Sequence, residues 1–178
     1  MLASLALVKA QVLDGKSEDA VATAQEALRC AKEAEDPRLE AMALQSLGEA
    51  HGAKGEAAAG QGKLTEAKAM LLELGDRRGA VAMMLALGEL QMGTPEEAEA
   101  SLEEAKEICG SDLFFVVLHC FSAHLGAGKR RGKTLNYQKG MADVLLKLAK
   151  ARRAKGEEQE AIKDALLAKK YCKAPGQT

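Results

Sequence analysis

The stretch DPRLEAMALQSLGE, residues 36–49, returns forty positions later as DRRGAVAMMLALGE, residues 76–89. The Asp-x-Arg opening and the Leu-Gly-Glu close of this stretch both recur at the same offset of 40 residues. Two motifs that share one register indicate an internal repeat. A period of about 20 to 50 residues is typical of solenoids, in which each unit buries its apolar face against the next unit.

A second pattern places a small residue ahead of apolar residues four and seven positions later, which puts all three on one face of a helix. It occurs four times, as Ala20, Ala24 and Ala27; Ala67, Leu71 and Leu74; Ala98, Leu102 and Ala105; and Ala161, Ala165 and Ala168. Gly15, Gly55 and Gly156 each follow an earlier apolar segment that contains a Leu and a small residue. Each unit is therefore predicted to be a helix, a glycine turn and a second helix.

This arrangement resembles the tetratricopeptide repeat (TPR) family, and residues 1–108 and 141–172 carry the pattern. The 40-residue spacing, with Asp-x-Arg between hairpins, is similar to the longer repeats of spindle-orienting G-protein modulators and kinesin light chains. The resemblance implies an all-α solenoid of helical hairpins in a right-handed superhelix, and a protein-binding scaffold rather than an enzyme. It does not identify the partner, because Glu49 and Glu89 stand where the modulator repeats prefer Asn.

The sequence predicts one TPR-like domain over residues 1–178. Its hairpins are expected at about 1–34, 37–75, 77–109 and 141–172. Two segments depart from the pattern. Residues 56–62 are interpreted as an insertion that adds about two helical turns or forms a projecting loop, and Gly60 and Gly62 favour the loop. Residues 111–140 are expected to form an irregular basic insertion, with a helix only over about 113–125.

Composition places the chain among folded proteins, since 47% of its residues are hydrophobic and 29% are charged. No apolar run approaches the roughly 20 residues that a membrane helix needs. The four cysteines are isolated from one another, with no C-x-x-C pair, so neither a disulfide framework nor a redox dithiol is predicted. A reducing intracellular compartment is expected, cytoplasmic by default, with an organelle left open.

No catalytic set follows from the repeat, so we expect no enzyme activity, no cofactor and no metal. Residues 127–134 fit a relaxed phosphate-binding loop, but no strand precedes them and no second nucleotide-binding motif is found. Cys120 and His124 share a helix face, and His119 lies beside them. The shared face supplies two metal ligands, whereas a metal site needs more. A basic surface segment and ordinary helix histidines are the preferred interpretations.

The binding surface is predicted on the wall formed by the first helices of successive hairpins. Five residues are expected to line this concave groove: Lys9, Gln45, Glu49, Leu85 and Glu89. Glu49 and Glu89 occupy equivalent positions, so together they would create a negative field suited to a basic segment. The expected partner is another protein, either one that offers such a segment or a neighbouring subunit of a large complex.

Charge is distributed unevenly, because residues 1–128 contain 11 basic and 21 acidic side chains whereas residues 129–178 contain 14 and 5. A basic patch is predicted at Lys129, Arg130, Arg131, Lys133, Arg152 and Arg153. The alternative function is therefore binding of nucleic acid or another acidic surface through residues 129–155. Nucleic acid is disfavoured because only Tyr137 lies near the first cluster. Head-to-tail self-association, with this basic part in the acidic groove of another copy, is a further hypothesis.

Overall fold

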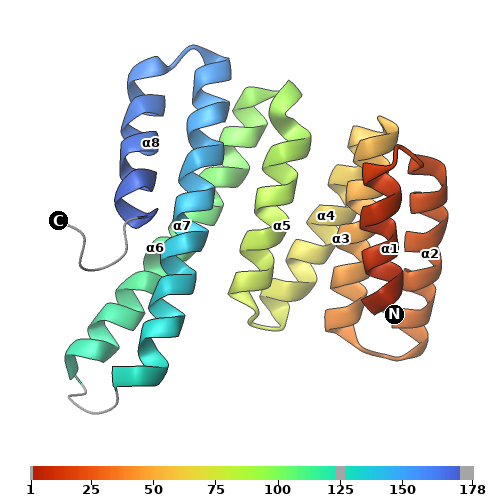
Figure 1. Ribbon diagram of the computed structural model, residues 1–178, viewed down its shortest axis with the longest axis horizontal. Helices are drawn as coiled ribbons and strands as arrows, with labels where there is room; N and C mark the ends of the chain where they lie inside the picture. The colour runs from red at the N-terminus through yellow and green to blue at the C-terminus, as the bar shows by residue number, and fades with distance from the viewer. Residues whose placement is uncertain (1, 123–126, 173–178) are drawn as a thin grey trace. The chain divides into compact units, whose positions relative to one another are not determined.

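The computed structural model describes residues 2–122 and 127–172, with side chains for residues 3–110 and 138–172. Every regular element within these ranges is helical, which confirms the all-α prediction (Figure 1). The chain divides into two compact units, Met1–Gln91 (unit 1) and Met92–Thr178 (unit 2). The third predicted hairpin is thus shared between the units, and the assignment of the whole chain to one domain stays a prediction.

The helices of unit 1 form a series in which each packs against the next along the chain. Their bounds are α1 Leu2–Leu13, α2 Ser17–Glu33, α3 Pro37–Lys54, α4 Ala57–Glu73 and α5 Arg77–Leu90. We call α1, α3 and α5 the A helices and α2 and α4 the B helices. The A helices also meet one another, since α3 contacts both α1 and α5.

Unit 2 is built on α7, which packs against both α6 and α8 (Figure 1). The bounds are α6 Pro95–Ser122, α7 Ala127–Lys155 and α8 Glu158–Cys172, and a short 3₁₀ helix, η1 Gln91–Gly93, precedes α6. The expected irregularity of 111–140 is therefore wrong for 111–122 and 127–140, while 123–126 lie outside the described residues. Pairing of α6 with α7 accounts for the difference, because tertiary packing overrides the weak helix propensity of glycine.

The turn inside a hairpin has the same backbone geometry three times. Gly15, Gly55 and Gly156 have φ of 75°, 87° and 88°, values that favour glycine. Each glycine amide donates to the carbonyl three residues back, and the next amide donates to the carbonyl five residues back, which is the Schellman end of a helix. The α7–α8 hairpin therefore repeats the α1–α2 hairpin at an offset of 141 residues.

The repeat between the first two B helices is regular, so the projecting loop expected at 56–62 is wrong. Helix α4 already begins at Ala57, and its buried residues follow those of α2 at 40 residues. The buried sets are Ala20, Ala24, Ala27 and Ala31 in α2, and Gly60, Leu64, Ala67 and Leu71 in α4. Gly60 lies where α4 crosses α3, because a Cβ there would come within 2.7 Å of the Gly48 carbonyl oxygen. The glycine serves close helix approach rather than a loop.

Aspartates cap the helices that start at two of the predicted hairpin boundaries. The Asp36 carboxylate accepts hydrogen bonds from the Arg38 and Leu39 amides at the start of α3, and Asp76 accepts one from the Gly79 amide at the start of α5. Each cap satisfies backbone donors that the first helical turn leaves without a partner. The caps thus fix the same entry into two successive A helices.

One predicted packing position is wrong in α8. Ala161 and Ala168 are buried as expected, but Ala165 is exposed and Asp164 is buried in its place, with only 6% of its surface accessible. A buried carboxylate needs a compensating charge or hydrogen bonds. Its partner is Arg152 on α7.

Candidate functional site

The predicted groove residues all lie on A helices of unit 1, and we call them the A-helix stripe: Lys9, Gln45, Glu49, Leu85 and Glu89. Lys9 and Glu89 are exposed, whereas the other three are half-buried. The stripe lies between positions that face the core, since Leu44 and Leu47 on α3 are almost fully buried. The role of the stripe as a binding surface stays a prediction.

Two members of the stripe are in direct contact. The Gln45 side-chain amide donates a hydrogen bond of 2.7 Å to the Glu49 carboxylate, one helical turn away. This bond holds the carboxylate in one orientation on the accessible face of α3. Glu89 stands at the equivalent place on α5, which contacts α3. The arrangement places two carboxylates on neighbouring helices.

A charged network joins the three helices of unit 2. The Arg152 guanidinium donates to Glu99 at 2.9 Å, to Asp164 at 2.6 Å and to Glu103. Lys155 adds a second cation on Glu99 at 2.6 Å. Only 14% of the Arg152 side chain and 8% of the Asp164 side chain are accessible. The network therefore ties α6 and α8 to α7, and Arg152 provides the cation that buried Asp164 requires.

The network shifts the pKa values of Glu99 and Arg152. Hydrogen bonds from Lys155 and Arg152 lower the pKa of Glu99 and outweigh the opposing effect of burial. Burial opposes ionisation of Arg152, but hydrogen bonds and charge from Glu99 and Asp164 overcome it and raise the Arg152 pKa above its ordinary value. Both pKa shifts favour the charged form, so Glu99 and Arg152 are ionised at neutral pH.

This network removes Arg152 from the predicted basic patch. A guanidinium engaged with three carboxylates has few donors left for phosphate. Arg153 is exposed, as predicted, and lies beside an apolar groove. The side chains of the other four predicted members lie outside the described part of the chain: Lys129, Arg130, Arg131 and Lys133.

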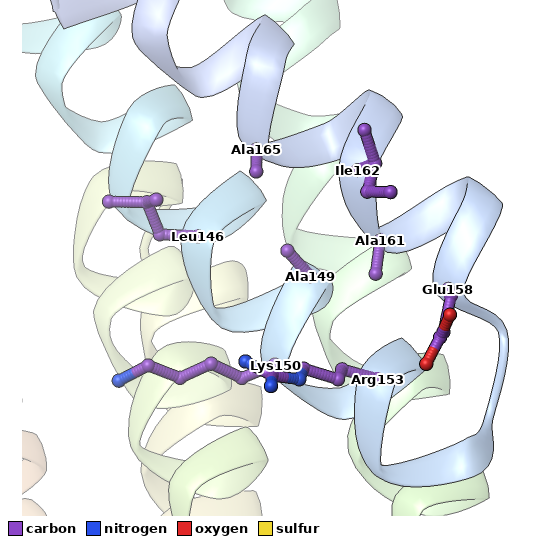
Figure 2. A pocket seen from close by; sticks show the side chains of 8 residues that line it. All are labelled: Leu146, Ala149, Lys150, Arg153, Glu158, Ala161, Ile162 and Ala165. Atoms are coloured by element: carbon purple, nitrogen blue, oxygen red, sulfur yellow. The ribbon is translucent and has the colours of Figure 1, made fainter.

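That groove lies between α7 and α8 and has a volume of about 450 Å³. We call it the α7–α8 groove; Figure 2 shows its lining residues, Leu146, Ala149, Lys150, Arg153, Glu158, Ala161, Ile162 and Ala165. Its floor is apolar and its charged residues are Lys150, Arg153 and Glu158. Leu146 and Ile162 line the same groove and are 45% and 57% exposed. Two large aliphatic side chains exposed in one groove mark a candidate contact surface.

The two chemical motifs considered in the sequence receive no support. Residues 127–134 lie in α7, so their backbone is helical and not the amide-lined loop that cradles phosphates. No metal-binding cluster of His, Cys, Asp or Glu occurs among the described residues, and the side chains of His119, Cys120 and His124 lie outside them. His51 is engaged locally, because its Nδ1 lies 2.7 Å from the Glu56 carboxylate.

Sequence reasoning missed both the charged network and the α7–α8 groove. Arg152 is 53 residues from Glu99, and no local spacing relates them. The groove carried a signal, because alignment on the turn glycines at the 141-residue offset places Ile162 opposite Val21, an apolar residue that packs against the core of unit 1.

Comparison with known proteins supports the fold. No protein-family model matches the chain, and no curated protein matches it. Solved structures do. TPR-like repeats described for a kinesin light chain of Podosopora anserina match with a TM-score of 0.55 at 14% identity, covering 95% of this chain and 93% of that one. The apo form of RapI matches with a TM-score of 0.54 at 12% identity, covering 94% of this chain and 66% of that one.

A third structure, BtubC from P. vanneervenii, matches with a TM-score of 0.50 at 18% identity over 97% of this chain and 81% of that one. These similarities establish a TPR-like helical-repeat fold, as the sequence predicted. None of the helices in the described ranges combines the length and apolar character that crossing a bilayer requires.

Proposed function

We propose that this chain is a non-catalytic scaffold that binds a Lys- or Arg-bearing segment of another protein on the A-helix stripe of unit 1. The observation that carries the proposal is the pair of carboxylates at equivalent positions on adjacent A helices, Glu49 on α3 and Glu89 on α5. A repeat presents the same chemistry at a regular spacing, which suits an extended or helical ligand with regularly spaced cations.

The neighbourhood of the two carboxylates supports the same ligand class. Gln45 orients the Glu49 carboxylate through the 2.7 Å hydrogen bond, so less side-chain entropy is lost on binding. Half-buried Leu85 adds an apolar contact one turn from Glu89. Lys9 occupies the equivalent position on α1 and reverses the charge there, so the basic segment would lie over α3 and α5.

Charge reversal at the stripe tests this proposal. A display library of random peptides selected on the wild-type chain should enrich Lys- and Arg-containing sequences. The Glu49→Lys/Glu89→Lys variant should bind the enriched peptides more weakly by on the order of tenfold or more, because two attractive pairs become repulsive. Helical circular dichroism should be unchanged, since both side chains are accessible.

A matched control carries the same change of charge on B helices. Glu18→Lys/Glu73→Lys alters exposed residues of α2 and α4 and should retain the wild-type affinity. Equal affinity of both folded variants would place the interface elsewhere. Enrichment of acidic peptides would contradict the ligand class.

The alternative, an acidic ligand on residues 129–155, has less support among the described residues. Arg152 and Lys155 are engaged with carboxylates, and the exposed cations Lys150 and Arg153 lie beside the apolar α7–α8 groove. We therefore retain the protein-binding proposal.

A further inference from the structure

The 141-residue offset gives every lining residue of the α7–α8 groove a counterpart in the first hairpin. Six of the counterparts belong to the core of unit 1: Leu5, Val8, Val12, Ala20, Val21 and Ala24. The remaining two, Lys9 and Ser17, correspond to Lys150 and Glu158. The α7–α8 groove is thus the same surface that α1 and α2 present to their neighbour.

In unit 1 this surface is covered by the next A helix. Helix α3 packs Ala43, Leu47 and Ala50 against α1 and α2, and these three residues are 0%, 3% and 0% exposed. Cover by α3 also explains a difference between the two hairpins. Leu5 is 7% exposed in the covered hairpin, whereas its counterpart Leu146 is 45% exposed. The groove therefore has the shape and chemistry of a site for an A helix.

Helix α1 carries the side chains that this site takes. Ala3, Leu7 and Ala10 stand forty residues before Ala43, Leu47 and Ala50, with identical residue types in identical order. In α1, however, this face is exposed, and Leu7 has 50% of its surface accessible. The chain thus presents both halves of its own repeat contact, a groove on α7 and α8 and the matching stripe on α1.

We propose that the α7–α8 groove binds the α1 face of a second copy of this chain, so that copies associate head to tail. Leu7 of the incoming copy takes the place that Leu47 takes in unit 1 and lies against Ala149, Ile162 and Ala165 (Figure 2). Ala3 and Ala10 permit the close helix approach that alanine permits in the internal contact. The interface is heterologous, so it links copies into a ring or an open chain.

This association differs from the one expected from charge alone. It uses apolar faces on α1 and α8, whereas the charge-based hypothesis places the basic part in the acidic groove. It is also independent of the A-helix stripe, because neither Glu49 nor Glu89 takes part. The two proposals can therefore fail separately.

Two variants that each block one half test the proposal. Wild-type protein should show a weight-average mass above the 18.8 kDa monomer in sedimentation experiments, rising with concentration. Leu7→Lys places a charge on the apolar α1 face, and Ile162→Lys places a charge in the α7–α8 groove. Each variant alone should therefore remain a monomer. Both side chains are at least half exposed, so circular dichroism and thermal unfolding should match the wild type.

Mixing the two variants is the decisive measurement. The intact α1 face of Ile162→Lys should dock into the intact groove of Leu7→Lys and give a species of twice the monomer mass that grows no further. Leu72→Lys, at an exposed leucine of α4, should associate like the wild type. A monomeric wild type would overturn the proposal and leave the groove to an A helix from another protein. Association of Leu7→Lys alone, or no complex in the mixture, would also overturn it.

Discussion

Gly60 and Gly62 are two residues apart in α4, yet they meet different surroundings. A Cβ on Gly60 would lie 2.7 Å from the Gly48 carbonyl oxygen, whereas a Cβ on Gly62 would have no atom within 4 Å. Gly60→Ala should therefore force α3 and α4 apart and lower the free energy of unfolding by about 1–3 kcal/mol. Gly62→Ala should raise it by about 0.5–1 kcal/mol, because alanine favours the helix. Urea denaturation of both variants measures the difference, and equal effects would contradict the crossing geometry.

The Arg152 network makes a second prediction at single residues. Arg152→Met leaves Asp164 buried without its cation, which should cost about 3–5 kcal/mol in the free energy of unfolding. Adding Asp164→Asn should recover part of that loss, since the uncompensated charge is gone. Lys163→Ala breaks an exposed pair with Glu160 and should change stability by less than about 1 kcal/mol. A double variant no more stable than Arg152→Met would show that Asp164 is not the source of the cost.

These residues also mark how far sequence reasoning reached. Alanines at helical spacing predicted the buried face of α2 correctly, because local periodicity alone decides which side of a helix is apolar. Gly60 was misinterpreted, because the sequence does not distinguish a glycine in a loop from a glycine at a helix crossing. Only the atoms of the neighbouring helix make that distinction. The role of Arg152 depends on carboxylates from two other helices, which no local pattern relates to it.

At the scale of elements, the α2–α3 and α4–α5 turns have different residues at the same left-handed position, a glutamate in the first and a glycine in the second. Glu35 has φ of 50° and Gly75 has φ of 69° at the equivalent position. The next amide in each turn donates a hydrogen bond to the carbonyl five residues back. This bond is 3.5 Å long from the Asp36 amide and 2.8 Å long from the Asp76 amide. A left-handed conformation disfavours side chains with a Cβ. The α2–α3 turn is therefore strained relative to the α4–α5 turn.

Exchange of the two residue types tests that strain. Glu35→Gly should raise the free energy of unfolding by about 0.5 kcal/mol, because relief of the left-handed glutamate exceeds the greater unfolded-state entropy of glycine. Gly75→Ala should lower it by about 1 kcal/mol. Thermal and urea unfolding of both variants supply the comparison. Destabilisation by Glu35→Gly would mean that the Glu35 side chain contributes more than its backbone costs.

Helix boundaries were predictable where a turn glycine ends a helix or a capping aspartate begins one. The glycine turns and the Asp36 and Asp76 caps each act within a few residues, so sequence alone located them. The extent of α6 and α7 was not predictable in this way. Two helices that pack against each other continue through residues of weak propensity, and that support is absent from the local sequence.

For the whole molecule, lowered carboxylate pKa values make stability depend on pH. The pKa of Glu99 lies below its ordinary value of 4.5 because Lys155 and Arg152 donate to the folded-state carboxylate. Such a group stabilises the fold fully above about pH 4.5, and the contribution disappears as pH falls through the lowered pKa. The pKa values of Glu26 and Glu56 in unit 1 are lowered too, through Arg29 and Lys54, but at exposed positions.

Exposed pairs contribute little to stability, whereas the network around Glu99 links three helices across a partly buried site. Unit 2 should therefore lose protection earlier than unit 1 as pH falls below about 4.5. Fragment-resolved hydrogen exchange, corrected for the intrinsic rate at each pH, should show α7 and α8 opening before α3 and α4. Glu99→Gln should lower protection of unit 2 at neutral pH and flatten its pH dependence, whereas Glu160→Gln, at an exposed pair, should leave that dependence unchanged. Parallel loss in both units, with no effect of Glu99→Gln, would show that acid acts on the molecule through its general charge rather than through this network.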